Sequence, residues 1–401
     1  MPRELRRFIR PGDGVLPGQA CAEPQTLVEA LVEQRAWYPG ASVFLGVNYS
    51  GIVRPEHADS LRLASYCGIG HNRALADAGV LGIHPVPYSR LGPMIRSGAI
   101  RCDVVLVQVS RPNSRGEYSL GLAADYLIPA LETARAVIGE ANDQVPWTRA
   151  EKFLRREDFA LVVETSRAPA APPPAKPGAL EAAIARHAAA FIPEGATLEF
   201  GIGTLPDAVC SALVGRKGLK IHSGMIGDGA AGLLRNGIAK GADCALLIGT
   251  RKLFDFARDN PAIRLRSCEY THDAGVLARI QSFIAINSAV EVDLAGRANS
   301  EVARGSYVGA VGGAPDFTHA ANRSQGGLSL LLIPSNRIVG ALAGPVTLPE
   351  TDAGIVVTEL GAADLRGCDL RERARLLAAI AAPEARAALE RREGSQSNRR
   401  L

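Results

Sequence analysis

The sequence predicts an α/β protein built from two open, mainly parallel sheets, and three observations support this fold class. The chain has 401 residues, more than one hydrophobic core usually organises, so two domains are expected. Short apolar runs alternate with stretches of helical periodicity, which is the pattern of parallel strands linked by crossover helices. A proline-rich segment separates two stretches of this kind.

That segment predicts the domain boundary. Residues 166–178 read SRAPAAPPPAKPG, with five prolines among small residues. Proline-rich stretches adopt extended, semi-rigid conformations and rarely lie inside a domain. We therefore expect an N-terminal domain over 1–165, a linker over 166–178 and a C-terminal domain over 179–401.

Individual elements follow from local patterns. The run CDVVLVQVS (Cys102–Ser110) is continuously apolar and β-branched, as expected of a strand buried on both faces. A helix is predicted from Tyr126 to about Ala141, after a turn-rich loop. In the second half the expected elements are a helix over Leu180–Ile192 and strands over Ala196–Phe200, Cys244–Thr250 and Gly354–Leu360.

Composition narrows the possible functions. The formal net charge of +4 is too small for this length to indicate nucleic-acid binding. None of the seven cysteines forms a C-x-x-C pair, so we expect no metal site and reduced, mostly buried thiols. The N-terminus has no apolar run after its arginines, and the longest apolar stretches are far shorter than the ~20 residues of a membrane helix. A cytoplasmic protein without membrane or nucleic-acid partners is expected.

Four glycine-rich or acidic motifs bear on chemistry. In FGIGTLPDAV a strand runs into Gly201-Ile202-Gly203 and a helix follows, with Thr204 placed as its N-cap. Glycines let a backbone approach a ligand closely, and free helix N–H groups favour an anion. The third glycine of a dinucleotide fingerprint is absent. This motif predicts either a phosphate contact or simply a turn.

The second motif is HSGMIGDG, in which His222 and Asp228 are either chemical groups or, as we favour, a hydrogen-bonded wall residue and a helix cap. In the third motif, alternation places Glu291 and Asp293 on one strand face, at an exposed edge or on the floor of a polar cleft. The fourth, GAVGGAPDF, contains Gly312-Gly313, whose N–H groups are either an oxyanion hole or part of a flexible loop.

These strings occur in a definite order that resembles acetyl-CoA hydrolases and CoA-transferases of the 4-hydroxybutyrate and succinate type. The resemblance covers nearly the whole chain. It is carried by CDVVLVQVSRPNSRGEYSLGLAADY, GIGTLPDAV, HSGMIGDG, INSAVEVDLAGRANSE, GGAPDF and VVTELGAADLRGCDLRERARLL.

The resemblance implies two similar open α/β domains with the active site in the cleft between them. It implies that coenzyme A is the substrate or product. It also implies that CoA lies against Gly201, Ile202, Gly203, Thr204 and Leu205, and that the backbone of Gly313 lines the oxyanion and CoA pocket. We further expect Gly312 and Gly361 in this pocket. In typical members a glutamate attacks the acyl-CoA carbonyl and forms a glutamyl-CoA thioester.

This sequence departs from the family pattern at two positions. The glutamate normally follows the His-Ser pair, where this chain has Gly224, and glycine has no nucleophile. Typical members also carry a CoA-binding lysine in a short loop, where this chain has only Arg337 as a nearby cation, and the two residues are not equivalent. The ligand class survives these changes, but the transferase mechanism does not follow.

Three functions therefore stay open. The first is hydrolysis of a short acyl-CoA by water, with Glu291 as the general base. The second is CoA transfer to a small carboxylate acceptor, with Glu291 or Glu301 supplying the nucleophile. The third is a non-catalytic CoA-binding protein, or a subunit whose partner supplies the missing group. A homo-oligomer is compatible with all three, and the ordered motifs argue against a sugar-phosphate isomerase on a related fold.

Overall fold

The computed structural model describes residues 5–173 and 176–396. Its N-terminal half contains a seven-stranded sheet in which every strand pairs in parallel. In spatial order these strands are β10 (Leu161–Thr165), β7 (Ala136–Asn142), β5 (Val104–Val109), β1 (Gly14–Pro17), β2 (Ser42–Leu45), β3 (Arg62–Ser65) and β4 (Leu81–Ile83).

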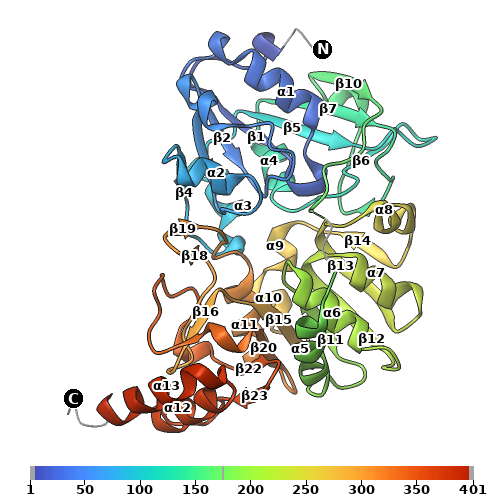
Figure 1. Ribbon diagram of the computed structural model, residues 1–401. Helices are drawn as coiled ribbons and strands as arrows, with labels where there is room; N and C mark the ends of the chain where they lie inside the picture. The colour runs from blue at the N-terminus through green and yellow to red at the C-terminus, as the bar shows by residue number, and fades with distance from the viewer. Residues whose placement is uncertain (1–4, 174–175, 397–401) are drawn as a thin grey trace.

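The C-terminal half contains a nine-stranded sheet, parallel throughout except for its last hairpin. In spatial order its strands are β23 (Gly361–Asp364), β22 (Ile355–Thr358), β20 (Leu328–Leu332), β15 (Phe283–Ser288), β11 (Thr197–Phe200), β12 (Leu219–Ile226), β13 (Ala239–Leu247), β14 (Ile263–Leu265) and β8 (Arg149–Ala150). Two mainly parallel sheets confirm the predicted fold class. The two halves lie one above the other in Figure 1.

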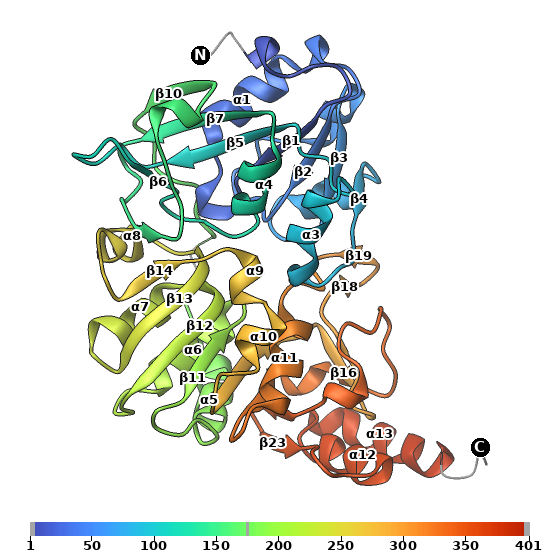
Figure 2. The same ribbon diagram turned by 180° about the vertical axis from the view of Figure 1, so that it is seen from behind.

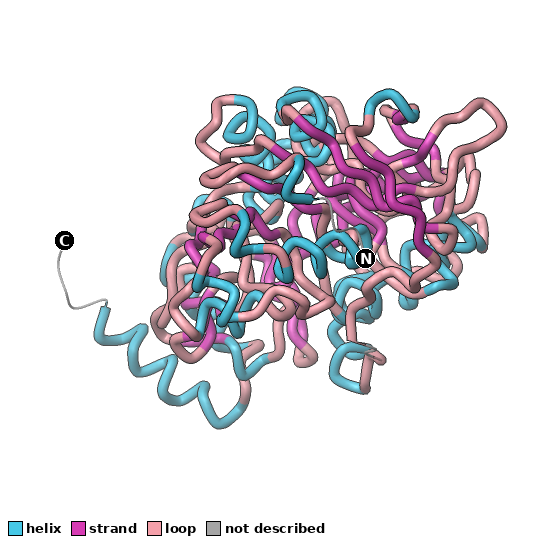
Figure 3. The backbone as a smooth tube through the Cα atoms, turned by 90° about the horizontal axis from the view of Figure 1, so that it is seen from above, coloured by secondary structure: helices cyan, strands magenta, loops and turns pink. Residues whose placement is uncertain are grey.

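Helices cover both sheets. The N-terminal half has α1 (Gln25–Glu33), α2 (Asn72–Asp77), α3 (Leu91–Arg96) and α4 (Leu127–Thr133). The C-terminal half has α5 (Ala179–Ala189), α6 (Thr204–Ala212), α7 (Asp228–Arg235), α8 (Arg251–Ala257), α9 (Cys268–Thr271), α10 (Ala274–Leu277), α11 (Ala314–Arg323), α12 (Leu370–Ala379) and α13 (Pro383–Gln396). The last of these projects away from the body toward the C-terminus (Figure 3).

Strand β5 shows why this sheet is buried on both faces. All six of its residues are buried. Val104 and Leu106 join the core that includes residues of α1, whereas Val105 and Val107 join the core that includes residues of α3 and α4. Side chains alternate across a strand, so an uninterrupted apolar run is needed when both faces are covered. Figure 2 shows α4 on the face seen from behind.

One predicted element is wrong in its second half. The helix expected over 126–141 ends at Thr133 as α4, and residues 136–142 form β7 instead. The run AVIGEAN pairs with β5 on one side and β10 on the other, and six of its seven residues are buried. Central pairing in the sheet overrides the local helical pattern.

The segment between β10 and α5 contains no helix or strand among its described residues, and Pro174 and Ala175 of the predicted linker lie outside the described part of the chain. The domain boundaries stay a prediction. The two halves share one sheet across this boundary, because β8 of the N-terminal half pairs with β14 of the C-terminal sheet.

Among the cysteines, six are buried and Cys368 is half-buried, and all are free thiols. No helix in the described residues has the length and apolarity needed to cross a bilayer.

Backbone hydrogen bonds also join the halves. The N–H of Ala124 donates to the carbonyl of Ala245, and the N–H of Leu247 donates to Leu122. The N–H of Cys268 then donates to the carbonyl of Asp125. The chain at 122–125 thus adds to the second sheet at β13, and it fixes the first half against α9.

The Asp125 carboxylate anchors a fully buried polar network at this junction. It accepts hydrogen bonds from Gln19 Nε2 at 2.6 Å, Tyr88 Oη at 3.3 Å and the N–H of Leu127 at 2.9 Å. Gln19 in turn accepts from Tyr66 Oη at 2.9 Å. Burial raises the pKa of Asp125 to about 6. The network holds two tyrosines of the N-terminal half in place.

We predict that Asp125→Ala lowers the free energy of unfolding by about 2 to 4 kcal/mol, because it leaves the Gln19 and Tyr88 donors buried without their acceptor. Urea unfolding followed by circular dichroism measures the loss. Asp364→Ala, which removes a partly exposed partner of Arg366, should cost less than about 1 kcal/mol. Equal losses in the two variants would contradict the assigned role of the network.

Candidate functional site

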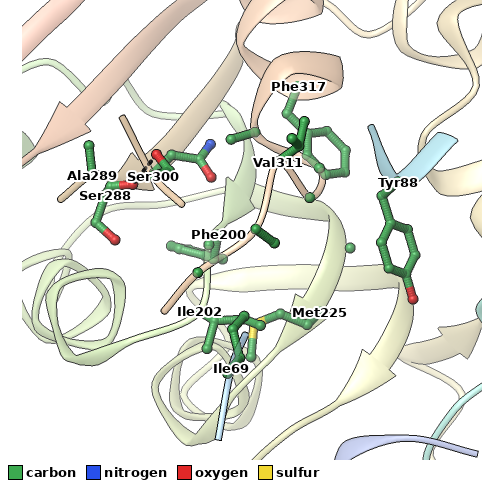
Figure 4. Close-up of a pocket in the computed structure, with 18 of the residues that line it drawn as sticks. Ile69, Tyr88, Phe200, Ile202, Met225, Ser288, Ala289, Ser300, Val311 and Phe317 are labelled. Carbon is green, nitrogen blue, oxygen red and sulfur yellow. Dashed lines mark hydrogen bonds between the residues drawn. The ribbon is translucent and has the colours of Figure 1, made fainter. Parts of the chain in front are cut away.

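A cavity of about 390 Å³ lies between the two halves of the chain. Its lining residues are Tyr66, Ile69 and Tyr88 from the N-terminal half, and Glu199–Ile202, Gly224, Met225, Leu246, His272, Asn287–Val290, Ser300, Val308–Ala314 and Phe317 from the C-terminal half. Figure 4 shows Ile202 and Met225 on one side of this space, Phe317 on the other and Tyr88 at one end. Parallel sheets place such sites beyond the carboxyl ends of their strands, where the glycine turns occur.

Only the beginning of the first glycine motif lines the cavity. Gly201 and Ile202 directly follow β11 and line it, whereas Gly203, Thr204 and Leu205 do not. Helix α6 starts at Thr204, so the N-cap is Gly203 rather than the predicted Thr204. Gly203 has a φ of +134°, a conformation that side chains other than glycine's rarely adopt.

The second contribution is the Gly312-Gly313 pair at the N-terminus of α11. The N–H of Tyr88 donates to the Gly312 carbonyl at 2.9 Å. A parallel bridge pairs Pro87 with Gly312, so the Gly312 amide faces the Val86 carbonyl, whereas the Gly313 amide donates to no backbone carbonyl among the described residues. Both glycines line the cavity. A free N–H group at a helix N-terminus suits an oxyanion.

Gly361 and Arg337 lie elsewhere. Gly361 opens β23 at the hairpin with β22, where a Cβ would lie 3.4 Å from Ile380. Arg337 is exposed in a short 3₁₀ turn. Neither lines the cavity.

Gly224 borders the cavity, and an imidazole occupies the space beside it. A Cβ placed on Gly224 would lie 3.1 Å from both Cε1 and Nε2 of His272, and 3.5 Å from Phe317. A Cβ on Gly313 would lie 2.7 Å from the same Nε2. The His272 ring therefore packs against both glycines, and a side chain at position 224 would meet that ring.

The His272 ring is held on two sides. Its centroid lies 4.8 Å from that of Tyr88 and 4.5 Å from that of Phe317. Nδ1 lies 2.9 Å from Thr271 Oγ1. Burial, helped by the nearby His222 imidazole, lowers the pKa of His272 to about 3, so the ring is neutral at physiological pH. His222 is buried and hydrogen-bonded as predicted, with its Nε2 2.9 Å from the Thr271 carbonyl, but it does not line the cavity.

Among the described residues, Glu199 is the only one with a carboxylate that lines the cavity. One oxygen, Oε2, accepts from Asn287 Nδ2 at 2.8 Å and from the N–H of Ile286 at 3.2 Å. Burial raises the pKa of Glu199 to about 8, so the carboxyl is mainly protonated at pH 7.

The predicted base Glu291 lies outside the cavity lining. Its Oε1 accepts from the N–H groups of Ala343 and Gly344, at 2.7 and 3.1 Å, and from Asn299 Nδ2 at 3.0 Å. Those bonds hold the 343–344 loop against β16 (Glu291–Asp293). Its catalytic assignment stays a prediction, to which the geometry adds no support.

The other two carboxylates of this motif are also engaged. Asp293 pairs with Arg297 at 2.6 Å. Glu301 accepts from Tyr307 Oη and Thr347 Oγ1, each at 2.8 Å. Neither lines the cavity, and Glu301, which the sequence offered as an alternative nucleophile, instead bonds two side chains of the surrounding chain.

Sequence reasoning missed His272 and Glu199. A signal for Glu199 existed, since it is the one charged residue in the apolar strand ATLEF just before the glycine turn. His272 ends a short helix, and no spacing in the sequence links it to Gly224. No cluster of three or more potential metal ligands occurs in the described residues.

Comparison with known proteins places this geometry in a family. Residues 249–393 match the profile of the acetyl-CoA hydrolase/transferase C-terminal domain. The 4-hydroxybutyrate coenzyme A transferase of Clostridium kluyveri is 34% identical over 399 residues, covering 94% of this chain and 92% of that protein. The acetyl-CoA hydrolase of Saccharomyces cerevisiae is 31% identical over 247 residues, which are 55% of this chain and 46% of that protein.

Solved structures agree. RipA from Yersinia pestis superposes with a TM-score of 0.92 at 26% identity, covering 98% of this chain and 96% of that one. The 4-hydroxybutyrate CoA-transferase of Porphyromonas gingivalis gives a TM-score of 0.81 at 30% identity, with the same coverage. Together with the full-length Clostridium match, these findings confirm the resemblance: the chain is an enzyme of the acetyl-CoA hydrolase/transferase family.

Proposed function

We propose that this enzyme hydrolyses the thioester of an acyl-CoA whose acyl group is small and uncharged. The hydrolysis is direct, with no covalent intermediate at residue 224. The observation that carries this proposal is the pairing of Gly224 with His272. The chain has no carboxylate at that position, and a neutral imidazole fills the adjacent space. Water then replaces the enzyme's own carboxylate as the group that attacks the carbonyl.

The lining favours an uncharged acyl group. Its side chains are mostly apolar, and it contains no lysine or arginine. A ligand carboxylate or phosphate would be desolvated there without a cation to pair with it, which is costly. The acyl chain and the thioester end of pantetheine fit this interior, and the CoA phosphates would lie outside it. The same argument favours water over a carboxylate acceptor.

The carbonyl oxygen would point to the amide of Gly313. This N–H group is free of backbone partners among the described residues, so it can stabilise the negative charge that develops on this oxygen. Gly201 and Ile202 support the thioester on the other side. Contacts of CoA with Gly203, Thr204, Leu205 and Gly361 stay predictions, as do a cytoplasmic location and a homo-oligomeric state.

CoA transfer is the second candidate, and Glu199 is the observation that favours it. Its carboxyl lines the cavity, and only its Oε2 is engaged in hydrogen bonds. Attack on a thioester requires the carboxylate form, which burial disfavours at neutral pH. Transfer through Glu199 would therefore demand that substrate binding ionise this group.

Trapping separates the two candidates. We predict that the protein releases CoA thiol from acetyl-CoA or butyryl-CoA and stays unmodified after borohydride treatment, because direct hydrolysis leaves no glutamyl thioester to reduce. Mass spectrometry of the intact chain and its peptides is the measurement. A reduced residue at Glu199 would establish transfer chemistry, and no release of CoA from any acyl-CoA would favour the non-catalytic alternative.

A substitution at the missing position gives a second test. Gly224→Glu alone should not gain acetate-dependent CoA transfer, since the new side chain meets the His272 ring. We predict that Gly224→Glu combined with His272→Ala makes room for the carboxylate and produces measurable transfer from butyryl-CoA to acetate, scored by chromatography of acetyl-CoA. The single His272→Ala variant is the control. Transfer activity in Gly224→Glu alone would contradict the steric argument.

The buried carboxyl of Glu199 gives a third test, based on the pH dependence of stability. Its pKa is raised from 4.5 in the unfolded chain to about 8 in the folded protein. Between these values the folded protein holds a proton that the unfolded chain has released, so this group makes stability fall as pH rises through the window. We predict that Glu199→Gln reduces the drop in melting temperature between pH 5 and pH 8. Glu164→Gln, at an exposed strand position, should keep the wild-type drop. An unchanged drop in Glu199→Gln would contradict the burial argument.

A further inference from the structure

We propose that His272 is the general base of this enzyme, accepting through Nε2 the proton of the water that attacks the thioester. The inference rests on the proposed hydrolysis. It assigns the water-activating role to a residue on the loop after α9, in place of the carboxylates offered by the sequence motifs.

Position is the first argument. Nε2 lies against Gly224, where the family's nucleophile would stand, and against Gly313, which also lines the cavity. A base must reach the water while the oxyanion donors reach the carbonyl oxygen of the same thioester. The contact between the imidazole nitrogen and Gly313 places the base next to the residue whose amide would hold this oxygen.

Orientation is the second argument. The ring lies between Tyr88 and Phe317, which come from different halves of the protein. Tyr88 is itself held through its hydroxyl by Gln19 and Asp125. The backbone N–H of His272 donates to Cys268 at 3.0 Å, which fixes the start of the loop. A ring held this way keeps one edge toward the cavity at little entropic cost when water binds.

The base role requires one tautomer of His272. Thr271 Oγ1 lies 3.3 Å from the Ser267 carbonyl, to which it can donate, and 2.9 Å from His272 Nδ1. In the tautomer that we propose, the hydroxyl donates to Ser267 and accepts from Nδ1–H, which leaves the lone pair on Nε2. This nitrogen has no hydrogen-bond partner among the described residues, and it belongs to an imidazole that lines the cavity.

The protonation states in the cavity favour the same assignment. Burial keeps the imidazole neutral, which is the form that can accept a proton, but the lowered pKa also makes it a weaker base than an exposed histidine. Glu199, the one carboxyl in the lining, is held mainly protonated and is a poor base at neutral pH. An imidazolium formed at Nε2 would lie beside the developing oxyanion, which offsets part of the cost of burying its charge.

The step balances without a co-reactant. The water oxygen forms a bond to the carbonyl carbon as its proton moves to Nε2, and the carbonyl oxygen takes up the negative charge at the Gly313 amide. When the tetrahedral intermediate collapses, the C–S bond breaks and the imidazolium returns its proton to the CoA sulfur. The products are free CoA thiol and a carboxylic acid, which ionises in solvent, and the enzyme is regenerated.

The test compares rates of thiol release from acetyl-CoA and butyryl-CoA. We expect His272→Gln to lower kcat by about 10² to 10³-fold with little change in KM, because it removes the base and leaves the CoA contacts. His272→Ala should be similarly slow, and free imidazole should restore part of its activity. Imidazole would not restore activity if the substitution had only damaged the structure. His187→Gln is the control and should keep wild-type activity, because this histidine is half-buried, its ring contacts a backbone carbonyl and it lies outside the cavity.

The outcomes separate the two proposals. A wild-type chain that releases thiol while His272→Gln stays within about threefold of it overturns the base assignment and leaves hydrolysis standing. Loss of more than about 10²-fold in Glu291→Gln, with His272→Gln active, would return the role to Glu291. If the wild-type chain hydrolyses neither acyl-CoA, the proposed function and the base both fail. Nitrogen-15 spectra of the imidazole rings give a readout that does not depend on turnover: a proton on Nε2 rather than Nδ1 of His272 would overturn the tautomer and with it the base.

Discussion

The backbone pairing between residues 122–125 and the second sheet is the constraint on which the site depends. It uses main-chain groups of Leu122, Ala124 and Asp125, so no side-chain substitution removes its partners. Because the segment continues directly into α4, the first sheet cannot shift against β13 without breaking these bonds. Tyr88 therefore lies at a fixed place relative to His272, although the two residues belong to different halves. These bonds at the junction hold the two sides of the cavity in place relative to each other. A site built from both halves requires such a fixed arrangement.

The electrostatics of the cavity follow from the same burial. A glutamate and a histidine both line it, yet burial raises the pKa of the first and lowers that of the second, so neither carries a charge at neutral pH. A pair of titratable groups whose pKa values are displaced in opposite directions is a common arrangement for proton transfer. It also means that a thioester meets no fixed charge on entry, and that in the proposed mechanism charge develops only during the reaction, beside the Gly313 amide.

Much of this could be predicted from the sequence. Continuous apolar runs correctly indicated strands buried on both faces, and the glycine turns after strands indicated which loops meet, because parallel strands end at one edge of a sheet. The helix over 126–141 failed because helical and strand periodicity are ambiguous in short apolar runs, and pairing with β5 and β10 decided the outcome.

The active groups were harder to predict, for a different reason. Strand alternation fixed the face of Glu291 but could not show that a distant loop at 343–344 would supply amides to its carboxylate. His272 is 48 positions from Gly224 and on another element, so their complementary volumes exist only in the folded chain. Motif reading finds residues that share a segment, whereas this site depends on one that fills the space another has vacated.

Packing alone does not account for the residue that fills that space. A phenyl ring would serve equally well between Tyr88 and Phe317, and it would bury no polar nitrogen. His272 instead places Nε2, which makes no hydrogen bond to another described residue, on a ring that lines the cavity. Under the proposed mechanism, this nitrogen holds the water against the thioester carbon. In this proposal the glycine at 224 and the imidazole at 272 act together, because the space beside a residue without a side chain is filled by the ring that would activate the water.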